Sequence, residues 1–157
     1  MIHIYDDVIK DPDSYVDEIL NIGFSDITDT VSVFRGIQPR ITDEAEKFIT
    51  NIFKNCSVEY NFVRQSPHMQ EEPNFIHSDE MMGDLTVLLY LNKIHPEMAG
   101  TTIYDNDHNK KATAYMKYNR MVVFDSKELH SRNIKENFGE ENDSRLVQII
   151  FLQSNGI

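Results

Sequence analysis

Alternating apolar and polar residues fill the second half of the chain and predict a series of short β-strands. The clearest strand covers residues 84–91, where Leu85, Val87 and Leu89 share one face. The other face of this strand is also mostly apolar, which indicates that both faces are covered. Further strands are predicted at residues 2–5, 31–34, 58–64, 101–104, 112–116, 121–124, 129–134 and 145–152.

The strand at residues 58–64 alternates regularly. Its pattern predicts Val58, Tyr60 and Phe62 on one side, with Asn61 and Val63 on the other. An antiparallel series of many short strands is typical of a jelly roll or another closed double sheet.

Two helices are predicted near the N-terminus. The first begins around Asp11 or Asp13, either of which can accept a hydrogen bond from a free backbone amide, and it ends at residues 21–23. The second begins within residues 42–46 and carries an apolar stripe that includes Ile49. Because the helices precede the strands, we expect a single domain in which a helical support (about 11–54) lies against a β core (about 57–153).

Composition indicates a cytoplasmic globular protein. The chain has 157 residues, of which 40% are hydrophobic, and this is enough for one domain with a substantial core. It contains no apolar run of the ~18 residues that a membrane span needs, and its first residues do not resemble a secretory signal. Cys56 is the single cysteine, so no disulfide can form within the chain, as expected in a reducing compartment.

The net charge of −11 bears on the partners of the protein. A negative field disfavours binding to nucleic-acid backbones and to anionic membranes. Lysines and arginines are scattered along the sequence and form no basic stripe, so we expect neither nucleic acid nor membrane as a partner.

The candidate chemistry begins with His77 and Asp79. Residues two apart in an extended chain point to the same side, so these two side chains can bind one ion from a single short segment. A third ligand must come from another strand, and His130 follows the apolar strand at residues 121–124. Two histidines and one carboxylate in this order are typical of the facial triad that binds Fe(II) and leaves positions open.

The charge of such a centre predicts what binds next. Two neutral imidazoles and one carboxylate leave a net positive charge on Fe(II), which suits a bidentate 2-oxo acid and then O2. The far carboxylate of a 2-oxo diacid needs a fixed cation, and Arg145 can supply a fork of donors.

At these residues the chain resembles the Fe(II)/2-oxoglutarate-dependent dioxygenases, in particular the prolyl-hydroxylase-like branch and its small phage and bacterial relatives. The matching segments are His77-Ser-Asp79, Leu89-Tyr90-Leu91-Asn92, Gly100-Thr-Thr-Ile-Tyr104, Asn119-Arg-Met-Val-Val-Phe124, His130 and Arg145.

The resemblance implies a fold and a set of roles. The fold is a double-stranded β-helix, a cupin-like jelly roll, mainly β with N-terminal helices. The cofactors are Fe(2+), bound by His77, Asp79 and His130, and 2-oxoglutarate, whose distal carboxylate binds Arg145 with help from Tyr90. For Tyr90, a buried core tyrosine with a satisfied hydroxyl is an equally good interpretation of the sequence alone.

The chain departs from the family pattern in one respect that bears on the site. Arg145 lies further beyond His130 than the basic residue of the family usually does, and the polar loop 136–144 explains the difference as an insertion. Arg132 is the alternative anchor for 2-oxoglutarate, although it follows His130 too closely to lie one strand further on.

The implied activity is hydroxylation of a C–H bond, with 2-oxoglutarate and O2 as co-substrates. The substrate is a prolyl or other protein side chain by resemblance, while a small molecule stays possible because substrate contacts lie on variable loops. The loop at residues 65–74 leads directly to His77 and is a candidate lid or substrate rim. The alternative function is a non-catalytic, cupin-like module that binds a metal or a small molecule, and turnover of 2-oxoglutarate distinguishes the two.

Overall fold

The computed structural model describes residues 2–72 and 74–155, and within these ranges the chain forms two antiparallel β-sheets. The strands are β1 (Ile2–Tyr5), β2 (Ser25–Thr28), β3 (Val33–Pro39), β4 (Cys56–Ser66), β5 (Leu85–Tyr90), β6 (Gly100–Tyr104), β7 (Lys110–Tyr115), β8 (Arg120–Asp125), β9 (Leu129–Arg132) and β10 (Arg145–Ser154). The helices are α1 (Pro12–Ile22), α2 (Glu44–Ile52) and a 3-10 turn at Glu141–Asp143.

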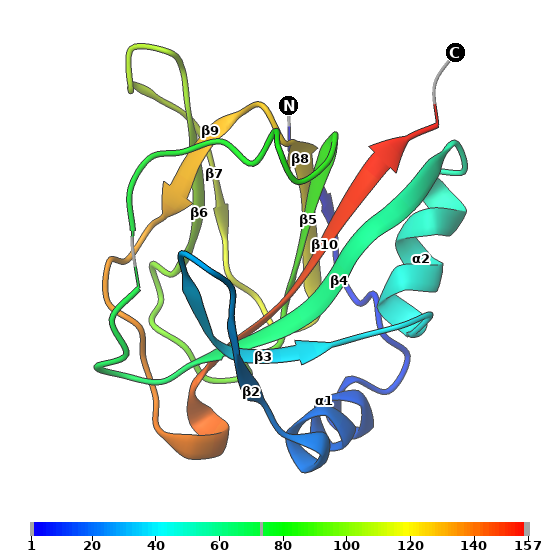
Figure 1. The fold of residues 1–157 in the computed structure, drawn as a ribbon, viewed down its shortest axis with the longest axis vertical. Coiled ribbons are helices and arrows are strands. Elements are labelled where there is room, and N and C mark those ends of the chain that lie inside the picture. Colours follow the sequence, from blue (N-terminus) through cyan, green and yellow to red (C-terminus); the bar gives the residue numbers. More distant parts are fainter. Residues whose placement is uncertain (1, 73, 156–157) are drawn as a thin grey trace.

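The two sheets face each other as the layers of a jelly roll. The larger sheet has the order β1-β8-β5-β10-β4-β3-β2, and the smaller sheet has the order β7-β6-β9. Helices α1 and α2 lie on the outer side of the larger sheet, away from the smaller one (Figure 1). This arrangement confirms the predicted fold class, a mainly β double sheet with N-terminal helices.

Both helices begin where the sequence indicated. The Asp11 carboxylate accepts a hydrogen bond from the Ser14 amide at the start of α1, and Asp43 does the same for the Glu46 amide at the start of α2. Helix α1 ends at Gly23, whose positive φ of 84° suits glycine. Among the described residues, no helix is long and apolar enough to cross a membrane.

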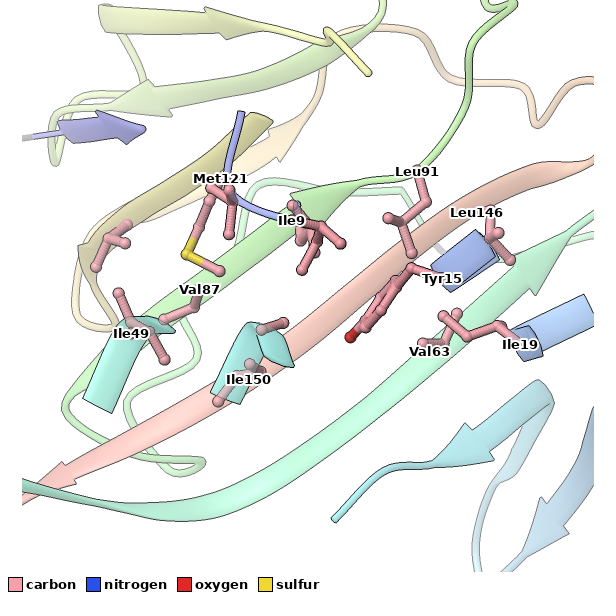
Figure 2. Packing of buried hydrophobic residues seen from close by; sticks show 14 of the residues in the cluster. Ile9, Tyr15, Ile19, Ile49, Val63, Val87, Leu91, Met121, Leu146 and Ile150 are labelled. Atoms are coloured by element: carbon pink, nitrogen blue, oxygen red, sulfur yellow. The ribbon is translucent and has the colours of Figure 1, made fainter. Parts of the chain in front are cut away.

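The core consists of two layers, one on each face of the larger sheet. Leu146, Ile150 and Leu152 of β10 face the helices, whereas Val147 and Ile149 face the smaller sheet. Figure 2 shows the helix-side layer, with Tyr15 over β10 and Ile49 near Val87 of β5. The predicted alternation in the strands now seen as β5 and β10 is confirmed, since both faces of each strand are buried.

A buried polar network fastens the helices to the outer face of the sheet. The Gln148 side chain on β10 is fully buried, and its amide oxygen accepts a hydrogen bond of 2.6 Å from the Tyr15 hydroxyl. Its amide nitrogen donates to Asp43 at 2.8 Å and to Asn61 at 2.7 Å. Both N–H donors and the oxygen of the Gln148 side-chain amide are therefore hydrogen-bonded, which fixes where both helices lie on β10.

Two sequence predictions about strands were wrong in detail. The strand expected at residues 31–34 is Val33–Pro39, and its hairpin partner Ser25–Thr28 was not predicted. This hairpin extends the edge of the larger sheet and is largely exposed, so it lacks the one-sided apolar pattern that marks a half-buried strand.

In β4, Val58 packs with Val63 in the helix-side layer, and not with Phe62 as the alternation predicted. A register shift opposite Phe151 and Leu152 marks a β-bulge at this point. Because a bulge inserts one residue, side chains on either side of it exchange faces.

Asn119 joins the N-terminal segment to the turn before β8. It is buried with a positive φ of 65°, its Oδ1 accepts a hydrogen bond from the Ile9 amide at 2.9 Å, and its Nδ2 donates to the Ile9 carbonyl at 2.9 Å. We therefore expect Asn119→Ala to lower the free energy of unfolding by about 3 kcal/mol, because two buried bonds are lost and alanine resists this backbone conformation. Urea unfolding measures the change.

Two further variants make this prediction specific. Asn119→Gly removes the same bonds but tolerates the positive φ, so it should cost about 1 kcal/mol less than the alanine variant. Asn142→Ala, at an exposed position, should change stability by less than about 0.5 kcal/mol. If the alanine and glycine variants lost the same free energy of unfolding, the positive φ of residue 119 would contribute nothing to the loss.

Candidate active site

A pair of backbone hydrogen bonds brings the two predicted histidine ligands together. His77 lies outside the regular strands, but its amide donates to the His130 carbonyl at 3.1 Å, and the His130 amide donates to the His77 carbonyl at 2.8 Å. Residues paired in this way point to the same face of a sheet. The imidazole ring centroids accordingly lie 4.5 Å apart.

Asp79 completes the group. Its amide donates to the Ser126 carbonyl at 2.8 Å, which fixes the segment that follows His77. The Asp79 carboxylate then lies 3.0 Å from Nε2 of His130 and 3.4 Å from Nε2 of His77. One donor atom from each of the three residues falls within 4.8 Å of the others, so the structure brings the three predicted ligands into one group that could hold a metal ion.

Both imidazoles are held in the tautomer that metal binding requires. Nδ1 of His77 lies 2.8 Å from the Phe75 carbonyl oxygen, and Nδ1 of His130 lies 3.0 Å from the Glu128 carbonyl oxygen. A carbonyl only accepts, so each Nδ1 carries the proton. Each Nε2 faces Asp79: with a proton it donates to the carboxylate, and release of that proton when a metal binds leaves a lone pair as the ligand.

The site holds a stable negative charge. Burial acts to raise the pKa of the Asp79 carboxyl, but hydrogen bonds from His130 and His77 outweigh burial and hold this pKa far below its usual range. The same contact with Asp79 raises the pKa of His77, against the opposing effect of burial. A cation placed among these side chains meets an ionised carboxylate.

Arg145 and Tyr90 lie on adjacent strands and point between the sheets. Tyr90 is opposite Val147 in the register, and Arg145 precedes Val147 by two residues on the same face of β10. Tyr90 is fully buried, and its hydroxyl forms a hydrogen bond of 2.8 Å with Oγ1 of Thr101. Its hydroxyl is thus satisfied without a ligand, as the core interpretation of this tyrosine required.

The Arg145 guanidinium has no hydrogen bond or ion pair with any residue in the described ranges. Burial, followed by the positive charge of Arg132, lowers the pKa of Arg145 to about 10, so the side chain stays charged at neutral pH. Its backbone is clamped by Asn92, which accepts from the Leu146 amide at 2.8 Å and donates to the Ser144 carbonyl at 2.9 Å. The backbone that carries Arg145 is therefore held in place, and its guanidinium is available to an anion.

Arg64 and Arg132 are close enough to act on the charge of Arg145, and the three form the arginine cluster. One carboxylate, Glu72, lies within it: its side chain is 6% exposed and is 3.0 Å from Nε of Arg64. Sequence reasoning considered Arg132 but missed Arg64 and Glu72. The signal that could have found Glu72 is the pair of acids, Glu71 and Glu72, in the loop that leads to His77.

Comparison with solved structures identifies the architecture. The chain is similar to the non-heme α-ketoglutarate-dependent epimerase SnoN of nogalamycin biosynthesis, with a TM-score of 0.71 and 10% identity over 98% of this chain and 77% of that one. A Trichoplax adhaerens prolyl hydroxylase in complex with a peptide fragment of hypoxia-inducible factor has a TM-score of 0.66 and 17% identity, over 98% of this chain and 83% of that one. A Pseudomonas putida prolyl-4-hydroxylase has a TM-score of 0.61 and 11% identity, over 99% of this chain and 93% of that one. The fold is that of the 2-oxoglutarate/Fe(II) oxygenases.

This likeness lies in structure and not in sequence. No protein-family model matches the chain, and neither does any curated protein. In this fold, His77 and Asp79 lie in the segment that precedes β5. His130 lies on β9, and Arg145 begins β10.

The loop between β4 and His77 is fastened over this part of the oxygenase fold. Asn137, which follows β9, donates to Oε2 of Glu72 at 2.6 Å and to the Gln70 carbonyl at 3.0 Å. The Asn74 side chain accepts from the Arg132 amide at 3.2 Å. The described residues of the loop are therefore held by the segment after β9 and by Arg64, while its role as a lid or rim stays a prediction.

We expect a metal ion to stabilise the protein through the three candidate ligands. Co(II), an air-stable substitute for Fe(II), should raise Tm by roughly 5–10 °C at a hundredfold excess over its Kd, because it binds only the folded site. Differential scanning calorimetry with and without Co(II) measures the shift. In Asp79→Ala the shift should disappear, whereas Asp17→Ala, an exposed acid on α1, should keep it. A full shift in Asp79→Ala would contradict the proposed ligand set.

Glu72→Gln tests how the loop is held. Burial favours the neutral acid, but the Arg64 charge and hydrogen bonds keep the pKa of Glu72 below its usual value. Removing the charge leaves Arg64 without its partner, so we expect the free energy of unfolding to fall by roughly 2 kcal/mol. This is less than for a fully buried ion pair, because Arg64 is partly exposed to solvent. Urea unfolding and amide exchange of residues 65–76 measure it. The neighbouring exposed Glu71→Gln is the control, and equal effects would refute the anchoring role.

Proposed function

We propose that the protein is an Fe(II)- and 2-oxoglutarate-dependent oxygenase that hydroxylates a C–H bond of its substrate. The observation that carries the proposal is the convergence of His77, Asp79 and His130, whose donor atoms lie within 4.8 Å of one another with both Nε2 atoms directed inward. Two imidazoles and one carboxylate form a set that suits Fe(II) and leaves coordination positions open.

The donor set fits the metal once any proton on the two Nε2 atoms is released, as metal binding to histidine requires. The backbone carbonyls of residues 75 and 128 hold the two rings in the ligating tautomer, and Asp79 is ionised. Bound iron and 2-oxoglutarate would supply oxygen activation coupled to oxidative decarboxylation to succinate and CO2. The residues of this chain orient the reactants and exclude water.

Arg145 is the proposed partner of the distal carboxylate of 2-oxoglutarate. It is a cation without an ion-pair partner among the described residues, and it lies on the inner face of β10, near the start of the strand. Tyr90 lies beside it in the wall of the site, and its hydroxyl is already hydrogen-bonded to Thr101. Arg132, the alternative anchor, has a polar partner in Asn137 already, at 2.6 Å, which favours Arg145.

A prolyl or other amino-acid residue is the substrate class we propose. Two of the structures described above are named prolyl hydroxylases, and one of them is in complex with a peptide fragment. In this chain the exposed ring of Phe75, whose centroid is 5.1 Å from that of His77, borders the metal centre. Helices α1 and α2 share a core with the larger sheet, so we propose that they form one domain with the site.

Succinate formation tests the proposed function. The purified protein, loaded anaerobically with Fe(II) and then exposed to O2 and 2-oxoglutarate, should release succinate above a metal-free blank. Asp79→Ala should lose at least about 90% of this activity because a ligand is missing, and Asp17→Ala should keep it. Absence of both succinate and Fe(II)-dependent 2-oxoglutarate binding in the wild type would favour the non-catalytic binding module.

Arg145→Gln tests the co-substrate site. Loss of a charge-assisted pair costs about 1.5–3 kcal/mol, so Kd for 2-oxoglutarate should rise about 10- to 150-fold. Anaerobic titration of the Fe(II) protein, followed by the absorption of the metal chelate, measures Kd. Lys47→Gln, which removes an exposed positive charge on α2, should leave Kd within about twofold. An unchanged Kd in Arg145→Gln would move the assignment to Arg132.

A further inference from the structure

The arginine cluster carries more positive charge than 2-oxoglutarate needs. Arg64, Arg132 and Arg145 act on one another's charges, and the buried carboxylate among them is Glu72. Glu72 offsets one guanidinium, and the distal carboxylate of 2-oxoglutarate would offset a second. One positive charge is left, in a protein whose net charge is −11.

Arg132 is the residue that keeps this charge. No carboxylate oxygen in the described ranges lies within 4.0 Å of its guanidinium, in contrast to Arg64, which has Glu72 at 3.0 Å. Toward the described residues its side chain donates one hydrogen bond, to the neutral amide oxygen of Asn137 at 2.6 Å. Glu72 and the exposed Glu136 act on Arg132 from a distance, and the remaining guanidinium donors are available to a ligand.

Strand geometry directs Arg132 toward the metal centre. His130 and Arg132 are two residues apart on β9, so their side chains leave the same face. Arg132 is opposite Thr101 in the register, and the Thr101 hydroxyl meets Tyr90 from the larger sheet. Thr101 therefore points between the sheets, and its cross-strand partner does the same.

We propose that Arg132 binds a carboxylate of the substrate and so selects an acidic substrate for the metal centre. This inference rests on the proposed oxygenase function. The position of Arg132, on the same face of β9 as His130, places the carboxylate beside the reacting carbon and not on a remote surface. A planar guanidinium can bind a carboxylate through two parallel hydrogen bonds, which fixes orientation as well as charge.

A carboxylate of this kind has two sources, and the experiment separates them. It is the α-carboxylate of a free amino acid, or it is an acidic side chain of a peptide. Because the surface field of the protein repels anions at long range, attraction must come from the local cluster. Discrimination between an acid and its amide should therefore depend on Arg132 itself.

The test uses matched acids and amides with Fe(II) protein and saturating 2-oxoglutarate. The probes are the proteinogenic L-amino acids and their primary amides, together with the blocked peptides acetyl-Gly-Pro-Glu-amide and acetyl-Gly-Pro-Gln-amide. Stimulation of succinate formation is measured for each pair. We expect at least one acid to stimulate at least about tenfold better than its amide, as loss of a charged partner predicts. The pair that responds identifies the source.

Two variants assign the effect to Arg132. Arg132→Gln should abolish the difference between acid and amide, and Arg132→Lys should retain part of it because the charge remains. Lys47→Gln, with the same change in net charge, should retain all of it. Melting temperatures of the variants show that each is folded.

Other outcomes overturn the inference. Equal stimulation by acids and amides, no stimulation by any acid, or an unchanged difference in Arg132→Gln would each exclude a substrate carboxylate at Arg132. If Arg132→Gln weakens 2-oxoglutarate binding as much as Arg145→Gln does, Arg132 belongs to the co-substrate site instead. If the wild type shows no Fe(II)-dependent binding of 2-oxoglutarate, the proposed function itself fails, and this inference fails with it.

Discussion

The site depends on two backbone hydrogen bonds between His77 and His130. These bonds, of 3.1 and 2.8 Å, join an irregular segment to a strand of the smaller sheet. Because paired residues in antiparallel strands share a face, the backbone alone sets the two rings side by side. The carbonyls of neighbouring residues then fix the ring tautomers. The positions and tautomers of the two candidate histidine ligands thus follow from the main chain.

The second organising feature is the unequal charge between the sheets. Taking charges out of water is costly, so a group of guanidiniums with a single buried carboxylate is an unfavourable arrangement unless anions complete it. The structure limits this cost by tying Glu72 to Arg64 and by linking Arg132 to Glu72 through Asn137. The remaining imbalance favours the binding of anions at Arg145 and Arg132.

The sequence predicted most of the elements because the large sheet is buried on both faces. In β5 and β10 apolar residues line both faces, and the capping acids Asp11 and Asp43 stand at the starts of the helices. It failed where burial is weak or the backbone is irregular. The exposed β2–β3 hairpin has no one-sided pattern, and the bulge in β4 moves Val58 to the face of Val63.

By itself, the sequence determined the mainly β architecture, the helical support and the candidate ligands His77, Asp79 and His130, because spacing and periodicity are local properties of a chain. The tertiary structure decided which distant residues meet. It placed Arg64 and Glu72 beside Arg145, and it paired Arg132 with Thr101, so that both point between the sheets. Contacts of this kind arise from strand order and register, which pair residues far apart in the chain, and no local pattern records them.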